Sequence, residues 1–255
     1  MNLHAKVALV TGAAHRLGRA MALALAERGC SIVLHYGQSA EAAREAAGEI
    51  ERLGVSVWPI AADLSRAEEI ERLFEAAWAA AGRLDVLVNS AASFERRPFE
   101  EITAAELDAV LALNLKAPFL ASQRAAARMR STERSEPGLI VNLVDHAADQ
   151  AWPGYSHHGA AKAALLQLTK VTARELAPAI RVNAIQPGAV LPAPGVAPGS
   201  DAWREVGERL PLGRTGAPED VGRALVYLAE NDFVAGTVLT VDGGESLIGT
   251  AHRGK

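Results

Sequence analysis

The residues best suited to moving a proton lie in the second half of the chain. His158 and Lys162 are four residues apart, so in a helix they lie on the same face. Asp145 directly follows the apolar run Leu139–Val144, and Asn114 lies in a predicted helix. An imidazolium has an ordinary pKa near 6.5 and gives up its proton near neutral pH. Together these side chains are suited to general acid–base chemistry.

A second group of residues is suited to binding phosphate. The apolar run Val7–Val10 leads directly into the segment TGAAHRLG at 11–18, after which a helix begins. The free backbone N–H groups and the positive dipole end at the start of a helix suit a pyrophosphate. Gly12 and Gly18 let the backbone approach such a ligand closely. The position of this turn after the first strand predicts a dinucleotide site.

Both groups depend on the elements that position them. Short runs rich in Val, Ile and Leu alternate with long alanine-rich helical stretches. Apolar residues on both faces are typical of strands in a buried parallel sheet. The alternation predicts an α/β fold, a single-domain, Rossmann-type, doubly wound parallel sheet of about seven strands with helices on both faces. The runs are Val7–Val10, Ser31–His35, Val55–Ile60, Leu84–Val88, Leu139–Val144, Arg181–Ile185 and Thr237–Val241.

Capping residues predict where the helices begin and end. Ser65 with Glu68, and Thr103 with Glu106, have the spacing of capping boxes. In a doubly wound sheet, ligands bind beyond the carboxyl ends of the strands, so the site is expected there. Glycines stand where helices should end, at Gly29, Gly54 and Gly82.

The composition excludes several classes of protein. The chain has 255 residues, of which 22% are charged and 49% hydrophobic, so it is too apolar to be disordered. A formal net charge of −4 excludes a nucleic-acid binder that relies on a basic surface. No apolar run approaches the roughly 18 residues of a membrane span. The single cysteine, Cys30, cannot form an intramolecular disulfide and favours a reducing, cytoplasmic location.

The segment at 11–18 resembles the corresponding turn of the short-chain dehydrogenase/reductase family. The usual family pattern is TGxxxGxG, and here Arg16 replaces the middle glycine. The TGxxxRxG form resembles the pteridine reductase branch, and the resemblance covers nearly the whole chain. It implies an NADP(H)-dependent oxidoreductase that reduces a pterin, a dihydrofolate or a related carbonyl or imine.

The end of the second predicted strand bears on the choice of dinucleotide. NAD enzymes of this fold usually carry Asp or Glu there to bond the ribose 2′-hydroxyl. The strand ends in HYGQS at 35–39, with no carboxylate to repel a 2′-phosphate. Arg16 supplies a nearby cation, and Ser39 can donate from a helix start. These charges favour NADP(H) over NAD(H), although pteridine reductases carry Arg where Gln38 stands.

The resemblance implies further contacts to the dinucleotide. Asp63 is expected to bond the adenine amino group, assisted by the backbone of Leu64. Small residues after Asn89 let the backbone approach the nicotinamide ribose, and Lys162 is expected to hold the ribose hydroxyls. The predicted cofactor-binding residues are Thr11, Gly12, Arg16, Leu17, Gly18, His35, Ser39, Asp63, Leu64, Asn89, Ala91, Lys162, Pro187 and Gly188.

The resemblance also implies the catalytic residues. The family uses Asn, Ser, Tyr and Lys, with Tyr as the acid. Asn114 and Lys162 match, and Asp145 takes the Ser position, as in pteridine reductases. His158 stands where the family has its Tyr, which is the main departure from the pattern. The predicted catalytic residues are Asn114, Asp145, His158 and Lys162.

The source of the proton remains open at this point. His158 is one candidate, and Asp145 is a second, with His158 orienting a water. Tyr155 is a third, if the helix already starts there, since it lies one turn before His158. The missing Tyr also allows an NADP(H)-binding sensor or scaffold without turnover. A further alternative is an NAD-dependent alcohol dehydrogenase of the general family.

The substrate side is predicted from aromatic residues. In pteridine reductases an aromatic at the position of Phe94 stacks a flat pterin against the nicotinamide, and the adjacent residue, here Ser93, approaches the cofactor. The segment 187–200 is rich in Pro and Gly and is expected to form a loop over the crevice. The predicted substrate-side residues are Ser93, Phe94, Asp145 and Tyr155.

One domain is expected over residues 1–249, with a substrate loop at 187–210 and a frayed tail at 250–255. No metal site is expected, because the neighbours His157 and His158 point about 100° apart on a helix. The resemblance implies a homotetramer built on the helices after the fourth and fifth strands, with the apolar segment Leu107–Leu120 compatible with it. No nucleic-acid or membrane partner is expected.

Overall fold

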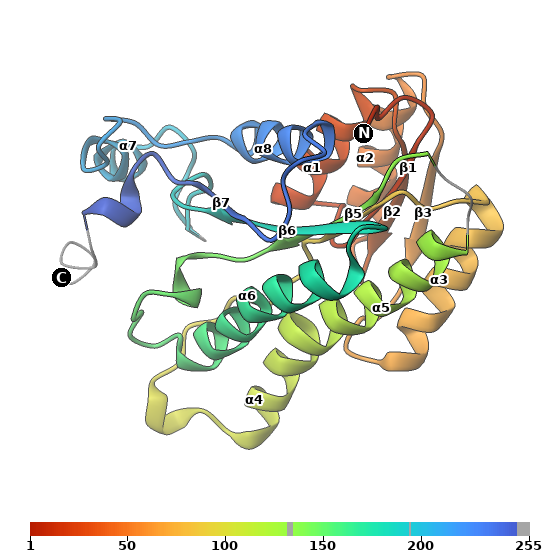
Figure 1. Cartoon of the computed structure of the whole chain (residues 1–255). Helices are drawn as coiled ribbons and strands as arrows, with labels where there is room; N and C mark the ends of the chain where they lie inside the picture. Colours follow the sequence, from red (N-terminus) through yellow and green to blue (C-terminus); the bar gives the residue numbers. More distant parts are fainter. Residues whose placement is uncertain (132–134, 194, 249–255) are drawn as a thin grey trace.

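The structure is a computed structural model of the chain, and it describes residues 1–131, 135–193 and 195–248. Within these residues, parallel strands form a seven-stranded sheet in the order β3-β2-β1-β4-β5-β6-β7 (Figure 1). The predicted doubly wound parallel sheet is therefore confirmed. The strands are β1 (Val7–Val10), β2 (Ser31–Tyr36), β3 (Val57–Ala61), β4 (Val86–Asn89), β5 (Gly138–Leu143), β6 (Ile180–Pro187) and β7 (Val238–Val241).

Helices cover both faces of the sheet (Figure 1). One face carries α1 (Arg16–Ala26), α2 (Ala40–Glu51) and α8 (Pro218–Glu230). The other carries α3 (Ala67–Ala81), α5 (Ala117–Arg130) and α6 (Ser156–Leu176). The remaining elements are α4 (Ala104–Leu111), the π-helical turn η2 (Ala112–Lys116), α7 (Asp201–Glu208), and the 3₁₀ turns η1 (Phe99–Glu101), η3 (His146–Ala148) and η4 (Glu245–Leu247).

Each face of the sheet has its own apolar core. Met21 and Leu25 of α1 and Leu225 of α8 are fully buried against one side of the strands. Ile70 and Leu73 of α3 fill the other side. Because both sides are covered, strands such as β1 and β4 are buried at every residue. This explains why their sequences are continuous apolar runs rather than alternating ones.

One of the two predicted capping boxes is confirmed and the other is wrong. Thr103 accepts from the backbone of Glu106, and the Glu106 side chain bonds back to Thr103. At the second, α3 begins at Ala67 without a side-chain cap. The reason is that Ser65 donates both its backbone N–H and its hydroxyl to Asp63 Oδ1, at 3.0 and 2.7 Å. A local Asx turn thus directs the Ser65 side chain toward Asp63, and α3 begins one residue later with Arg66 as its N-cap.

The predicted glycine positions lie at or just after helix ends. Gly82 caps α3 with φ +69°, and Gly29 and Gly54 also have positive φ after α1 and α2. Among the described residues, no helix is long and apolar enough to cross a bilayer. The predicted tail at 250–255 lies outside the described residues.

Candidate active site

His158 lies in the first turn of α6 and is 1% exposed. Its Nε2 is 2.7 Å from Oδ2 of Asp145, which follows the end of β5. Its Nδ1 is 3.1 Å from the carbonyl oxygen of Ser93 and 3.2 Å from Nδ2 of Asn114. Both ring nitrogens of His158 therefore have partners: Nε2 contacts a carboxylate, and Nδ1 contacts a backbone carbonyl and a side-chain amide.

Asn114 is positioned by the π-helical turn between α4 and α5. Single π turns inside helices often occur at functional sites. Asn114 Oδ1 accepts from the Ser93 backbone N–H at 2.8 Å, which fixes the orientation of the amide. Its Nδ2 then donates to the Ser93 carbonyl at 2.9 Å and faces His158. His158 Nδ1 thus lies between an acceptor and a donor, and this arrangement suits both the charged and the neutral imidazole.

Asp145 is the more accessible member of the pair. Its side chain is 21% exposed, against 2% for that of His158. Oδ1 accepts the backbone N–H of Ala147 at 2.9 Å, so the carboxylate also caps η3. Burial raises the pKa of the Asp145 carboxyl, but the His158 hydrogen bond and the Lys162 charge outweigh it and hold the pKa below its ordinary value. Asp145 is therefore a carboxylate at neutral pH.

Lys162 lies one turn after His158 and is 4% exposed. Its ammonium donates to the carbonyl of Leu143 at the end of β5, at 2.8 Å. Burial lowers the pKa of the Lys162 ammonium, and the Asp145 carboxylate partly offsets this effect. The predicted catalytic residues Asn114, Asp145, His158 and Lys162 are thus gathered at one end of the sheet.

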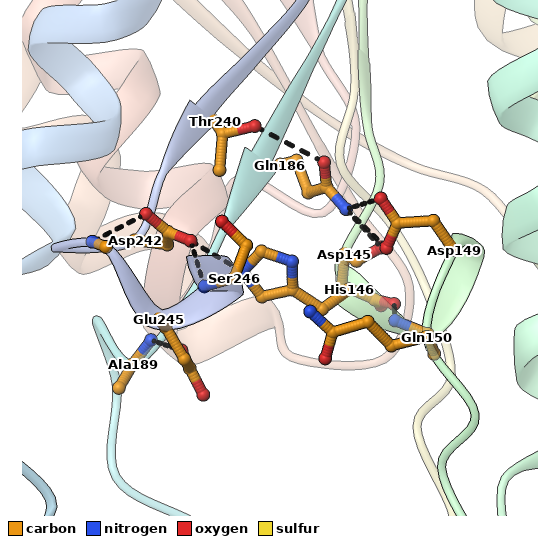
Figure 2. Close-up of polar contacts among 12 residues, drawn as sticks. Asp145, His146, Asp149, Gln150, Gln186, Ala189, Thr240, Asp242, Glu245 and Ser246 are labelled. Atoms are coloured by element: carbon orange, nitrogen blue, oxygen red, sulfur yellow. Dashed lines mark hydrogen bonds and ion pairs between the residues drawn. The ribbon is translucent and has the colours of Figure 1, made fainter. Parts of the chain in front are cut away.

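The loop that carries Asp145 is braced from behind by residues that the sequence did not single out (Figure 2). Gln186 Nε2 donates to the Asp145 carbonyl at 3.3 Å and lies 3.1 Å from both carboxylate oxygens of Asp149. Thr240 Oγ1 donates to Gln186 Oε1 at 3.4 Å. The only signal in the sequence is a polar residue next to last in each of two neighbouring strands, β6 and β7.

A second contact of this brace involves the next residue in the loop. His146 Nε2 lies 3.3 Å from Oδ2 of Asp242, just after β7 (Figure 2). Glu245 Oε2 accepts the backbone N–H of Ala189, where the predicted substrate loop begins. A Cβ added to Gly188 would lie 2.9 Å from the backbone Cα of Asp242, so the close approach of the two loops requires glycine. The loop after β5 and the loop after β6 are therefore tied to the same end of β7.

Aromatic side chains lie beside His158. Phe94 is 50% exposed and stacks on Tyr155, with ring centroids 4.6 Å apart and an angle of 17° between the planes. Phe94 also meets His158 edge-on at 4.9 Å and Trp152 at 6.3 Å. Tyr155 was a candidate acid only if the helix started there. The helix begins at Ser156, so this condition is not met. The ring of Tyr155 instead extends the aromatic surface.

Ser93 also has a side-chain hydroxyl near the site. Its hydroxyl oxygen is buried and has no hydrogen-bond partner among the described residues. The Asn114 amide bonds the backbone of Ser93, not this hydroxyl. A buried, unbonded hydroxyl costs free energy, and a bound polar ligand removes that cost.

The dinucleotide turn leads from β1 into α1. Gly12 has φ +66°, and a Cβ added to Gly18 would lie 2.2 Å from the Gly12 carbonyl oxygen. The N-cap residue of α1, His15, makes no side-chain capping bond, and the first turn holds no acidic residue. Arg16 has φ +50°, a left-handed conformation that disfavours side chains. Glycine adopts this left-handed backbone without the steric cost that arginine bears there.

Some of the predicted cofactor residues are used by the chain itself. Thr11 Oγ1 accepts the backbone N–H groups of Ser90 and Ala91, at 2.9 and 3.0 Å. Asn89 is buried and donates to Asn142 at 2.8 Å. The Thr11 contacts hold the turn after β1 against the turn after β4, where a Cβ on Gly12 would lie only 3.0 Å from Ala91 Cα. The Asn89 bond ties β4 to β5.

His35, another predicted cofactor residue, lies beneath the turn after β1 with its ring bonded to the chain. It is 2% exposed, its Nδ1 accepts from the Gly12 N–H at 3.1 Å, and its Nε2 lies 3.0 Å from the Ala62 carbonyl. Both nitrogens are taken, so the ring does not offer a polar atom to a cofactor. The sequence missed this because the bonds join three separate strand ends.

The other predicted residues lie at the same carboxyl edge. Asp63 is exposed after β3, while Leu64 is buried. Hydrogen bonds from Ser65 lower the pKa of the Asp63 carboxyl. Ser39 stands before α2 without a side-chain capping bond, and Leu17 packs partly buried in α1. Pro187 ends β6.

Comparison with known proteins gives a consistent result. The family described as Enoyl-(Acyl carrier protein) reductase matches residues 12–246. The chain is 37% identical over 251 residues to "3beta-hydroxysteroid dehydrogenase 1" of Eggerthella lenta, covering 96% of this chain and 95% of the relative. It is similar to a dehydrogenase/reductase from Sinorhizobium meliloti, with a TM-score of 0.87, 37% identity and coverage of 95% and 96% of the two chains. A short chain dehydrogenase from Burkholderia cenocepacia in complex with NADP gives a TM-score of 0.85, 34% identity and coverage of 96% and 99%.

Proposed function

Because the chain belongs to the short-chain dehydrogenase/reductase family, we propose that it is an NADP(H)-dependent reductase whose proton comes from the Asp145–His158 pair. The observation that carries this proposal is the 2.7 Å contact between His158 Nε2 and Asp145 Oδ2. The contact supports the proposal because it joins two titratable groups at the position to which the resemblance assigns the family's acid.

The residues of the turn after β1 fit a dinucleotide. The start of α1 lacks a side-chain cap, so its first N–H groups are available to a pyrophosphate. Gly12 and Gly18 leave the space that a Cβ would fill. The buried hydroxyl of Ser93 needs a polar partner at the other end of the site. When bound, the reduced nicotinamide supplies the hydride.

Charge supports the phosphorylated form of the dinucleotide. Arg16 is exposed at the start of α1, and no carboxylate occurs in the segment 35–39 that ends β2. A guanidinium there suits a 2′-phosphate, and Ser39 lies close by in the chain. The related structure from Burkholderia cenocepacia holds NADP, in agreement with this assignment.

The proton is handled by Asp145 and His158 together. In the charged pair, Nδ1–H of His158 donates to Ser93 and Nε2–H donates to Asp145. His158 passes its Nε2 proton to the carboxylate of Asp145, and Asp145, the more exposed member, passes that proton on to the atom being reduced, so Asp145 is a carboxylate again afterwards. Neutral His158 then keeps its remaining proton on Nδ1, and uptake of one proton from water restores the pair.

Lys162 keeps the carboxylate charged between turnovers. Its buried positive charge lowers the pKa of Asp145, and its bond to Leu143 fixes it near the end of β5. We also assign it the ribose hydroxyls of the dinucleotide, as the family resemblance implies. Asn114 holds the Ser93 backbone, and with it the Nδ1 side of His158.

The substrate is a flat ring system with a reducible C=N or C=O bond, and we favour a pterin or dihydrofolate. Phe94 and Tyr155 present a stacked aromatic surface beside His158. Flat ligands suit such a surface because rigid rings lose little side-chain entropy. A second candidate is a polycyclic ketone, favoured by the 37% identity to a hydroxysteroid dehydrogenase.

The test is NADPH consumption with a panel of dihydropterins, dihydrofolate, quinones, ketosteroids and aldehydes. We expect turnover with the flat substrates, and its loss in both His158→Ala and His158→Tyr. His157→Gln is the matched control, because His157 is the next residue along the helix and makes no contact with Asp145. Tight NADPH binding without turnover, with activity appearing only in His158→Tyr, supports the sensor or scaffold instead. Preference for NAD⁺ over NADP⁺ supports the alcohol dehydrogenase.

We further propose that the chain forms a homotetramer through α4, α5 and α6. A groove of about 780 Å³ lies on these helices, with Leu111, Leu115, Phe119 and Val171 among its lining residues. Phe119 and Val171 are 44% and 41% exposed. Light scattering of Phe119→Glu, compared with the wild type, tests this: a smaller assembly is expected.

A further inference from the structure

The ring of His35 joins the ends of three strands beneath the dinucleotide turn. It belongs to β2, its Nδ1 bonds the Gly12 amide after β1, and its Nε2 bonds the Ala62 carbonyl after β3. Its own carbonyl accepts the N–H of Ala13 at 2.9 Å. His35 therefore holds two successive amides of the turn, one with its ring and one with its backbone.

The partners of this ring dictate its protonation. An amide N–H can only donate, so Nδ1 must carry a lone pair. A carbonyl can only accept, so Nε2 must carry the proton. Only the neutral Nε2–H tautomer satisfies both bonds. An imidazolium would set a second N–H against the Gly12 N–H in a buried place, where an unsatisfied donor is costly.

The Gly12 amide matters because the rest of the turn depends on its orientation. Gly12 holds φ +66°, and its carbonyl oxygen lies so close to α1 that Gly18 has no room for a Cβ. His35 holds the peptide before Gly12 through its N–H, and a change in φ at Gly12 would turn this carbonyl against α1. The first N–H groups of the helix, and Arg16 with them, would move as well.

We infer that His35 is a positioning residue of the dinucleotide turn, which its neutral ring holds in the binding shape and its protonation releases, so that coenzyme affinity falls in acid. This inference rests on the proposed use of NADP(H). Two further observations agree with it. Burial lowers the pKa of the His35 ring, while the Ala62 bond raises it, and the ring stays neutral near pH 7. On the two segments that bond the ring, the charged residues closest in sequence to Ala62 and Gly12 are Asp63 and Arg16. Neither is among the causes of the shift in the His35 pKa.

The first experiment reads the tautomer directly in the wild-type protein. A long-range ¹H–¹⁵N NMR spectrum at pH 7.5, with His35→Gln used to assign the signal, is expected to show a neutral ring protonated at Nε2. A ring protonated at Nδ1, or at both nitrogens, overturns the inference. This measurement needs no coenzyme, so its result stands even if the proposed function fails.

The second experiment measures NADP⁺ binding by calorimetry from pH 8 to pH 5 for the wild type, His35→Gln and His35→Leu. Glutamine offers an acceptor and a donor without titrating, so its affinity is expected to match the wild type at pH 8. Below pH 6 the wild type is expected to weaken about five- to tenfold more than His35→Gln, the loss of one buried hydrogen bond. Protonation of the 2′-phosphate weakens both proteins equally and cancels in the comparison.

The leucine variant completes the test. It is expected to bind NADP⁺ about five- to tenfold more weakly at every pH, since it lacks the acceptor for Gly12. Identical pH profiles for the wild type and His35→Gln, or wild-type affinity in a folded His35→Leu, overturn the inference. If His35→Leu does not fold, the glutamine comparison and the NMR tautomer decide. No binding by the wild type at pH 8 rejects the proposed function, not the tautomer.

Discussion

Two buried histidines at the same edge of the sheet illustrate two uses of an imidazole. His35, under the dinucleotide turn, is bonded on both sides by backbone groups. His158, in the candidate active site, contacts a carboxylate through Nε2, and both a donor and an acceptor through Nδ1. Their exposures, 2% and 1%, are nearly equal, so burial does not distinguish them. Their partners do.

The difference decides which ring can carry a proton. The partners of His35 allow one protonation state, so the ring behaves as a fixed link. Those of His158 tolerate two states, because Nδ1 can either accept from Asn114 or donate to Ser93. The nearby carboxylate of Asp145 stabilises the charged state. A buried histidine is thus assigned to structure or to catalysis by counting which states its partners satisfy.

The largest expected effect comes from breaking the catalytic pair. In Asp145→Asn, the amide can neither carry the proton nor stabilise a charged His158. We expect kcat to fall about 10²- to 10⁴-fold, the usual worth of general acid–base catalysis. NADP⁺ affinity should change little, since the dinucleotide turn lies on other strands. Steady-state kinetics and calorimetry measure the two quantities, with Glu75→Gln on the exposed side of α3 as the control. An active Asp145→Asn enzyme rejects the assigned proton source.

The next effect concerns the dinucleotide side alone. Arg16→Gly removes the guanidinium and also the strain of φ +50°, whereas Arg16→Ala removes only the guanidinium. A charge-assisted hydrogen bond contributes about 1.5 to 3 kcal/mol, so both variants should bind NADP⁺ about 10- to 100-fold more weakly. Affinity for NAD⁺ should stay as it is. Arg16→Gly alone should gain about 1 kcal/mol of stability, read from thermal unfolding.

Equal losses for NADP⁺ and NAD⁺ would contradict the assignment of Arg16 to the 2′-phosphate. A gain in stability for Arg16→Ala would contradict the role of the backbone strain. Either result leaves the catalytic pair unaffected.

A smaller effect is expected from the brace behind Asp145. Gln186→Leu removes the donor to the Asp145 carbonyl and to Asp149 (Figure 2). The Asp145 carboxylate is then held less rigidly, and we expect kcat to fall about three- to tenfold. This is less than the roughly 10- to 100-fold loss typical when a residue that orients a metal ligand is removed. Thr103→Ala is the control, since loss of the confirmed cap costs a similar ~1 kcal/mol far from the pair. Equal kcat values in the two variants would reduce Gln186 to a purely structural role.

The sequence was sufficient for the sheet because its signal is local. A strand covered on both faces must be apolar throughout, and each of the seven predicted runs overlaps a strand. The ends of the strands follow less closely from the sequence: β3 begins at Val57 rather than at the predicted Val55. The box at Ser65 failed because Asp63 competes for the same hydroxyl, and the pattern of a capping box does not contain that competitor.

In the candidate site, too, the residues found from the sequence are those with a local signal. Spacing and resemblance together indicated Asp145, His158 and Lys162, and the fold gathers them at one strand end. The bonds of His35 and Gln186 could not be predicted, because each joins residues from three separate elements with no fixed spacing. The stacking of Phe94 on Tyr155 likewise depends on where two loops meet.

The smallest expected effect tests whether His35 is a fixed link in the absence of any coenzyme. Burial lowers the pKa of its ring in the folded state. Above the ordinary pKa of about 6.5, both folded and unfolded chains hold it neutral, and it contributes its full stability. As the pH falls below that value, the unfolded chain takes up the proton first, so stability is lost down to the folded-state pKa. We therefore expect the melting temperature of the wild type to fall faster between pH 6.5 and pH 5 than that of His35→Gln. Because His158 is present in both proteins, parallel curves would mean that the two histidines do not differ in the way their partners indicate.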